Sequence, residues 1–388
     1  MAPSVLFTAS TYLHLFNFHR PYLAAFRALG WEVHIACGGA RAEIPEADRE
    51  FPLPFEKKMT APANLRAQRL LRRAMEETAY DLVIAHTSLA AFFTRRAAAG
   101  LGRRRPPVVN VVHGYLFDDG TGPLKREILL GAERITAPQT DLLLTMNQWD
   151  YALARETKLA RRVENIPGMG VDFSRLEGRE ADGAAKRREL GLGPADLLAV
   201  YGAEFSARKS QAALIRAMAQ VPENVKLALP GQGALREDCK ALARRLGLEG
   251  RIVFPGQEPD MPRWYAAADL AASASRSEGL PFNVMEAMYA GLPVVASAVK
   301  GHTDLLSGGG GLLYSYGDEA ALSAGLCRLA EDAALRRELG ARARQAVLPY
   351  GLDHVLPRVM EAYLSAASGE PLPIRVPAGA ARTKAQGR

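Results

Sequence analysis

Two glutamates, Glu278 and Glu286, flank a turn with the residue types of an anion-binding site. The residues between them read GLPFNVM, and Asn283 with Glu286 three positions later fits a capping box at a helix start. The free N–H groups of such a helix start, near Phe282, would also attract an anion such as a pyrophosphate. Glu286 could then accept the hydroxyls of a ribose, and Glu278 those of a sugar joined to the pyrophosphate. The capping box alone would explain Glu286, but it leaves Glu278 and the tight turn unexplained: Gly279, Leu280 and Pro281.

Polar side chains also follow several β-branched runs, at the positions where parallel strands would end. Ligands of open parallel sheets bind at the carboxyl ends of the strands. His113 ends the run VVNVVH, and an imidazole there can hydrogen-bond a sugar hydroxyl or steady the charge of a leaving group. A core imidazole bonded to the backbone is the alternative. The other candidates at this edge are Ser10, Thr11, His86, Asn147, Glu204 and the loop of Glu278.

Strands and helices alternate along the chain and would position these residues. The strand patterns VLFTAS, WEVHIAC, DLVIAHTS, VVNVVHGY and TDLLLTMN are separated by helical ones, which predicts a doubly wound parallel sheet. A Gly- and Pro-rich stretch at 164–183 indicates a linker, after which the alternation restarts with LLAVYGAEF. We therefore expect an α/β protein of two Rossmann-like domains that face each other across a cleft. They would be residues 1–168, joined by a helix at 354–367, and residues 169–353, with a disordered basic tail at 369–388.

The composition fits a globular protein of this size. The 388 residues are 48% hydrophobic and 23% charged. The three cysteines lie far apart without zinc or redox spacing, and no run approaches the ~20 apolar residues of a membrane helix, so we expect a cytoplasmic protein. The net charge of +7 gathers in the first half and the tail. It fits plain solubility or peripheral contact with anionic lipid headgroups, whereas no nucleic-acid motif occurs.

The stretch around Glu278 resembles the signature of retaining glycosyltransferases of the family 4 type, which have the GT-B fold. In that signature two glutamates separated by seven residues precede Ala-Met and a Gly-Leu-Pro-Val-Val strand, as Glu278, Glu286 and residues 287–295 do here. The resemblance runs from about residue 4 to 365. Through FTASTYLHLFNFHRPYL, NVVHGYLF and IPGMGVDF it extends to the subgroup that makes capsule and exopolysaccharide. It implies that Glu286 holds the nucleotide ribose and that Glu278 holds the donor hexose.

A second family element is a Gly-Arg turn followed by a lysine, whose two cations grip the donor diphosphate. Lys209 falls at the lysine position, but Glu204 stands where arginine is usual. A carboxylate cannot bind pyrophosphate, so Arg208 is the residue that could supply the missing charge. The resemblance makes His113, Glu278 and Lys209 the catalytic candidates. The donor site would also include Glu204, Arg208, Gly279, Leu280, Pro281, Phe282, Asn283 and Glu286.

The resemblance says less about which residues contact the acceptor. Many relatives have a paired-glycine loop after the first strand, and this chain has Ser-Thr-Tyr-Leu-His at 10–14 instead. We place Thr11, His14, His19 and His86 on this side of the cleft, and for each histidine a core imidazole is the alternative. The acceptor implied by the resemblance is a lipid-linked saccharide in surface polysaccharide assembly.

The sequence therefore indicates a retaining glycosyltransferase that moves a hexose or N-acetylhexosamine from a nucleotide-sugar co-substrate, with a UDP-sugar favoured. The resemblance implies front-side attack, in which a donor phosphate oxygen takes the acceptor proton. No Asp-x-Asp, His-x-x-x-His or Cys-x-x-Cys occurs, so we expect neither a metal nor another cofactor. Two alternatives stay open. One is a UDP-sugar 2-epimerase on the same fold, which needs no acceptor, and the other is a catalytically silent partner protein, suggested by Glu204.

Overall fold

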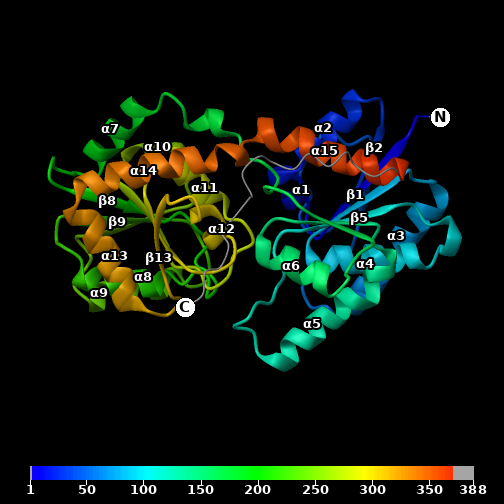
Figure 1. Cartoon of the computed structure of the whole chain (residues 1–388), viewed down its shortest axis with the longest axis horizontal. Coiled ribbons are helices and arrows are strands. Elements are labelled where there is room, and N and C mark those ends of the chain that lie inside the picture. Colours follow the sequence, from blue (N-terminus) through cyan, green and yellow to red (C-terminus); the bar gives the residue numbers. More distant parts are fainter. Residues whose placement is uncertain (1, 370–388) are drawn as a thin grey trace, which may run out of the picture.

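A computed structural model of the chain describes residues 2–369, and Figure 1 shows two lobes lying side by side. Each lobe is built on one sheet, with seven strands in the first and six in the second. Neighbouring strands run parallel throughout both sheets of the described chain. The predicted α/β fold with two parallel sheets is confirmed. The expected disordered tail lies outside the described residues, apart from Gly369, which ends the last helix.

The first sheet has the strand order β3-β2-β1-β4-β5-β6-β7. Its central strands are buried on both faces, which explains why their sequences are unbroken apolar runs rather than alternating ones. The strands are β1 Ser4–Ala9, β2 Glu32–Cys37, β3 Arg49–Pro52, β4 Leu82–His86, β5 Val108–Val112, β6 Leu142–Thr145 and β7 Arg162–Asn165. The helices of this half are α1 Tyr12–Phe18, α2 Arg20–Ala28, α3 Pro62–Glu77, α4 Ser88–Ala99, α5 Pro123–Thr136 and α6 Gln148–Glu156.

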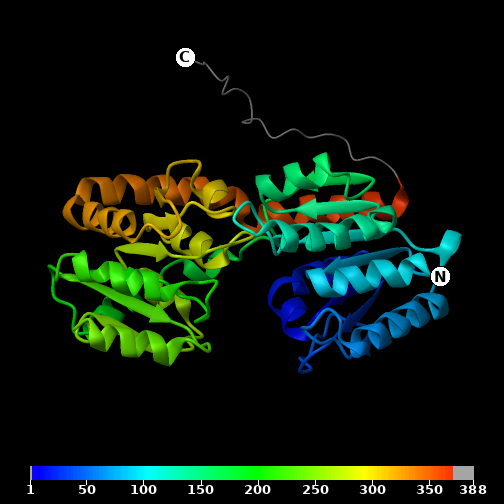
Figure 2. The same cartoon turned by 90° about the horizontal axis from the view of Figure 1, so that it is seen from below.

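The second sheet has the order β10-β9-β8-β11-β12-β13, so it is wound in the same way around its first strand. Its strands are β8 Leu197–Val200, β9 Val225–Pro230, β10 Ile252–Gly256, β11 Leu270–Ser273, β12 Val294–Ser297 and β13 Gly311–Tyr314. Its helices are α7 Glu180–Glu189, α8 Gln211–Ala217, α9 Arg236–Arg245, α10 Met261–Ala267, α11 Phe282–Tyr289, α12 His302–Leu306, α13 Glu319–Glu331 and α14 Ala333–Val347. Figure 2 shows both sheets between their helices.

The last helix, α15 (Leu352–Ser368), returns from the second half to the first. Its Tyr363 is fully buried and meets the rings of Phe7, Tyr22 and Phe26 edge-on or stacked. A single apolar cluster therefore continues from the first sheet to the second. Within residues 2–369 no helix has both the length and the apolar character needed to cross a bilayer.

Three local expectations need correction. The edge strand β3 was not anticipated, because its four residues REFP include two charges and a proline and carry no strand signal. The stretch 164–183 is only partly a linker, since β7 extends to Asn165 and α7 begins at Glu180. Asn283 does not cap a helix: α11 starts at Phe282, with Pro281 in the N-cap position, so no capping box explains Glu286.

Candidate active site between the two halves

Two backbone segments meet where the halves touch. The segment after β5 carries His113 and Gly114, and the segment after β11 carries Glu278 and Gly279. A Cβ added to Gly279 would lie 1.8 Å from the His113 carbonyl oxygen, and one added to Gly114 would lie 2.7 Å from the Gly279 Cα. Only glycines allow this approach, and Gly114 also has a φ of +113°. The close contact of the two main chains brings His113 and Glu278 to one cleft of about 370 Å³.

Glu278 is the centre of charge in this cleft. Its side chain is only 6% exposed and accepts from Lys209 Nζ at 2.5 Å and from Arg208 at 3.0 Å. Burial alone would raise the pKa of Glu278, but the charges of Lys209 and Arg208 outweigh it and hold the pKa below its ordinary value. Glu278 is therefore an ionised carboxylate that holds two cations at the wall of the cleft.

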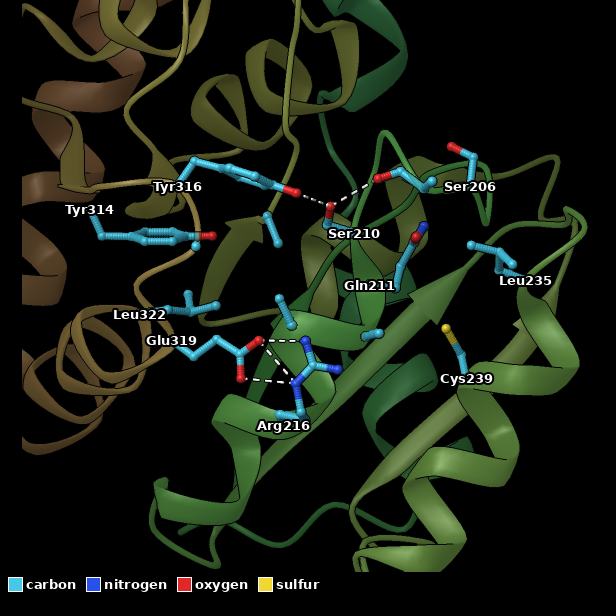
Figure 3. A pocket seen from close by; sticks show the side chains of 15 residues that line it. Ser206, Ser210, Gln211, Arg216, Leu235, Cys239, Tyr314, Tyr316, Glu319 and Leu322 are labelled. Carbon is cyan, nitrogen blue, oxygen red and sulfur yellow. Dashed lines mark hydrogen bonds and ion pairs between the residues drawn. The ribbon is translucent and has the colours of Figure 1, made fainter. Parts of the chain in front are cut away.

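The turn that carries Arg208 and Lys209 is held in place by the residue that follows it, Ser210, whose contact with Tyr316 is drawn in Figure 3. Ser210 lies in the left-handed region with a φ of +51°, which is unusual for a residue other than glycine. Its hydroxyl donates to the Ala207 carbonyl and contacts the Tyr316 hydroxyl at 3.1 Å. The backbone of Arg208 also accepts from the N–H of Arg276 at 2.7 Å. These contacts hold the cationic turn against the segment that ends in Glu278.

The cavity in Figure 3 lies beside this turn and measures about 370 Å³. An ion pair between Arg216 of α8 and Glu319 of α13 crosses it. Because its charged groups are paired with each other, we interpret the cavity as part of the support for α8. Gln211, the first residue of α8, donates to the carbonyl of Glu204 at 2.8 Å. The side chain of Glu204 itself is exposed.

Glu286 lies in the first turns of α11, next to α10. Its carboxylate accepts from the Tyr265 hydroxyl at 3.2 Å, and burial raises the pKa of Glu286. Asn283, one residue into the same helix, donates to the carbonyl of Gly202 at 3.0 Å. Both side chains thus tie α11 to neighbouring elements of the second half, while the carboxylate of Glu286 keeps acceptor capacity for a ligand.

Four histidines from the first half converge at the other wall. His14 of α1 and His113 after β5 line the cleft, and His19 and His86 are fully buried behind them. One nitrogen of each ring lies within 4.8 Å of the corresponding nitrogen of every other. Burial lowers the pKa of all four imidazoles, to about 4 for His14, and nearby rings lower the pKa of the other three further. The cluster is therefore neutral at ordinary pH.

A buried lysine links the halves beside this site and was not predicted. Lys300, after β12, donates to Asp150 at 2.8 Å and to the carbonyls of Tyr115 and Phe117 at 3.0 and 2.9 Å. Asn147 caps α6 by accepting from the N–H of Asp150, and it also donates to the Gly279 carbonyl at 3.2 Å. A single lysine after a strand gives no sequence signal of its own, because most lysines are solvated.

The structure brings many of the predicted residues together. The cleft is lined by the following members of the predicted set: His14, His113, Arg208, Glu278, Gly279, Leu280 and Phe282. Lys209 is not part of this lining, but its ammonium donates to Glu278, which is. Pro281, Asn283, Glu286 and Glu204 lie outside its lining. His19 and His86 expose no surface, so they cannot contact an acceptor directly, and Thr11 caps α1 by accepting from the N–H of His14 at 3.3 Å.

Comparison with known proteins gives matches over both halves. The sequence profile of the family Glycosyl transferases group 1 matches residues 183–346, and that of the Glycosyl transferase 4-like domain matches residues 20–168. The chain is 31% identical over 370 residues to EpsD of Bacillus subtilis strain 168, which is named as a glycosyltransferase. The match covers 94% of this chain and 97% of EpsD.

Solved structures with the same fold include HepE of Anabaena in complex with UDP-glucose. It superposes with a TM-score of 0.75 at 21% identity, over 93% of this chain and 99% of HepE. Sucrose-phosphate synthase from Thermosynechococcus elongatus superposes with a TM-score of 0.80 at 20% identity, over 95% of this chain and 100% of the synthase.

Proposed function

We propose that this chain, which belongs to the group 1 glycosyl transferases and is a glycosyltransferase of the GT-B fold, takes its sugar from a UDP-sugar donor. The observation that carries the proposal is the group formed by Arg208, Lys209 and Glu278 at the cleft. HepE, whose fold the chain shares, was solved with UDP and with UDP-glucose, which supports the choice of nucleotide.

The charges of this group suit a diphosphate. Two cations contact one carboxylate, so the group of Arg208, Lys209 and Glu278 carries one net positive charge before a donor binds. The Arg208 side chain is 49% exposed and its planar guanidinium matches phosphate oxygens, whereas Lys209 is buried and acts as a fixed point charge. Arg208 would thereby supply the positive charge of the arginine that relatives have at the position of Glu204. Stabilising the departing diphosphate would supply much of the rate acceleration.

The sugar would lie between the two walls of the cleft. Glu278 can accept hydrogen bonds from hexose hydroxyls, and His113 faces it from the first half. In the retaining reaction we propose, the bond from the sugar carbon to the diphosphate oxygen breaks as the acceptor hydroxyl oxygen attacks from the same face. The hydroxyl proton passes to the departing phosphate oxygen. Glu286, with its carboxylate near the helix start, would hold the ribose.

We further propose that the acceptor is a lipid-linked saccharide in surface polysaccharide assembly, and that α5 rests on the anionic membrane that carries it. Leu124, Ile128 and Ile135 of α5 are 76%, 64% and 59% exposed and lie on one face of the helix. Leu116, which lines the cleft, is 65% exposed in the segment before α5. Lys125 is an exposed cation of the same helix, and Figure 1 shows α5 projecting from its lobe.

Vesicle sedimentation tests the membrane contact. The protein should sediment with vesicles that contain anionic lipid but not with vesicles of neutral lipid alone. The Ile128→Asp variant should not bind either kind. Leu246→Asp is a matched control, because Leu246 is an exposed leucine at the end of α9 in the other half. Equal binding of both variants would show that α5 does not rest on the membrane.

A thermal-shift panel of UDP, GDP, ADP and their sugar conjugates tests the donor site. A binder raises the melting temperature by mass action, and we expect a selective shift with UDP and at least one UDP-sugar. Lys209→Ala should remove the shift, whereas Arg245→Ala, an exposed cation of α9, should retain it. No shift with any nucleotide would contradict the proposal and favour a silent partner protein. Conversion of the sugar of a UDP-sugar in the absence of any acceptor would favour the UDP-sugar 2-epimerase.

A further inference from the structure

We propose that His14, His19, His86 and His113 form a four-imidazole site for a transition-metal ion of the zinc type. The inference rests on these four rings alone and does not depend on the identity of the sugar donor. The sequence gives no metal motif, because the ligands are far apart in the chain: one lies in α1, one between α1 and α2, one at the end of β4 and one after β5. The fold brings them together at the carboxyl edge of the first sheet, where parallel strands end.

The spacing of the ring nitrogens fits tetrahedral coordination. A Zn²⁺ ion with four imidazole ligands at 2.0–2.1 Å requires nitrogens about 3.3–3.4 Å apart. The Nε2 atoms of His14 and His113 are 3.4 Å apart, and those of His14 and His19 are 3.2 Å apart. His86 Nδ1 lies 3.2 Å from His113 Nε2. The remaining pairs lie within 4.8 Å, so small side-chain movements would complete the tetrahedron.

Hydrogen bonds can join the four rings only in pairs. Each ring nitrogen carries either one proton or one lone pair in the ring plane. His14 Nε2 and His113 Nε2 each have two histidine neighbours, so at most two of the three contacts can be linear hydrogen bonds. A metal ion would use all four inward lone pairs at once, with the proton of each neutral ring on its outward nitrogen.

The rings of the cluster lie in apolar surroundings. His19 and His86 are fully buried, and their outward nitrogens have no hydrogen-bond partner within residues 2–369, so their only polar contacts are those inside the cluster. Phe7 stacks on His86 at 5.8 Å and Phe18 packs against His14 at 5.3 Å, which forms an apolar shell around the site.

Four protein ligands give the ion a closed coordination sphere, which is typical of a structural site. It would fasten α1 and its junction with α2 to the ends of β4 and β5, and so fix the acceptor-side wall of the cleft. His113 would then hold this wall rather than contact the sugar through its Nε2 atom. The donor diphosphate would still be bound by the cations of the opposite wall.

The test uses the full chain without a polyhistidine tag, stripped of metal with a chelator and titrated with Co²⁺ and with Zn²⁺. We expect about one ion per chain, the strong visible absorption of tetrahedral Co²⁺, and a melting temperature that rises with added Zn²⁺. His14→Ala should weaken binding by roughly ten-fold or more and change the Co²⁺ spectrum. This ligand is the best choice because it is only partly buried, so its loss should leave the fold intact.

His34→Gln is the matched control. His34 is a buried histidine of the same half that bonds to Tyr80 and Glu32 outside the cluster, so this variant should bind Co²⁺ as the wild type does. The proposal is overturned if the wild-type chain takes up no metal. It is also overturned if His14→Ala and a second ligand variant, His86→Gln, keep wild-type stoichiometry and spectrum. Loss of binding in His34→Gln as well would equally argue against a site at the cluster.

Discussion

Replacement of Lys300 by methionine tests how the two halves are held together. The lysine belongs to the second half and is 8% exposed, and its ammonium donates to Asp150 and to two carbonyls of the first half. Lys300→Met keeps the length and apolar stem of the side chain but removes the charge. Asp150, which is fully buried, is left without its cation.

The expected cost follows from this burial. Removing one partner of a buried ion pair typically costs about 3–5 kcal/mol, far above the ~0–1 kcal/mol of a surface pair. Burial already raises the pKa of Asp150, and Lys300 opposes that rise, so the variant should raise the pKa further. A folded-state pKa above the unfolded value contributes stability at low pH that is lost as the pH rises through the folded pKa. The penalty of Lys300→Met should therefore be larger at pH 8 than at pH 5.

Urea unfolding at these two pH values measures the penalty, and a double-mutant cycle with Asp150→Asn isolates the pair. We expect the double variant to be less destabilised than the sum of the single variants, because the Asp150→Asn substitution leaves no buried charge that needs a partner. Lys57→Met, at an exposed lysine, is the control and should change the free energy of unfolding little. A cost below about 1 kcal/mol for Lys300→Met, or strict additivity in the cycle, would refute the reasoning.

Further predictions concern the cleft and the core. Gly279→Ala places a Cβ 1.8 Å from the His113 carbonyl oxygen, so it should destabilise the protein by about 1–3 kcal/mol in urea unfolding and impair donor binding. Wild-type stability and donor binding in Gly279→Ala would show that the main chains at His113 and Gly279 are not in close contact. Glu286→Gln should weaken UDP binding in calorimetry. Since burial raises the pKa of Glu286, wild-type affinity should fall as the pH drops towards that pKa, and the variant should lose this dependence. Tyr363→Ala removes a fully buried ring packed on Phe7 and should cost roughly 3–5 kcal/mol; a neutral effect would mean that α15 does not anchor the first half.

The sequence was sufficient to predict the two sheets, because buried parallel strands are continuous apolar runs bounded by turns. It also placed His113 and Glu278 at strand ends, where such sheets bind ligands. Edge strand β3 lacked this signal because none of its four residues is buried and two of them are charged. The capping box failed because the proline at 281 already fixes the start of α11, which leaves Asn283 inside the helix.

Contacts between distant residues were beyond the reach of pattern reasoning. His14, His19, His86 and His113 are separated by up to 99 positions, and only the winding of the sheet brings their nitrogens together. Lys300 likewise looks like a solvated lysine until the other half of the chain surrounds it. Residue type and local period identify elements and their ends, whereas such clusters depend on the packing of whole elements.

Calorimetric titration with UDP and with a panel of UDP-hexoses, on the wild type and on Glu278→Gln, tests the central claim most directly. If Glu278 holds the donor sugar, the wild type should bind one UDP-hexose more tightly than UDP. In the variant the affinity for that UDP-hexose should fall roughly ten-fold, or by about 1.4 kcal/mol, so that the gain over UDP is lost. The variant should still bind UDP through Arg208 and Lys209. An unchanged gain from the hexose in Glu278→Gln, or no nucleotide binding by the wild type, would contradict the account.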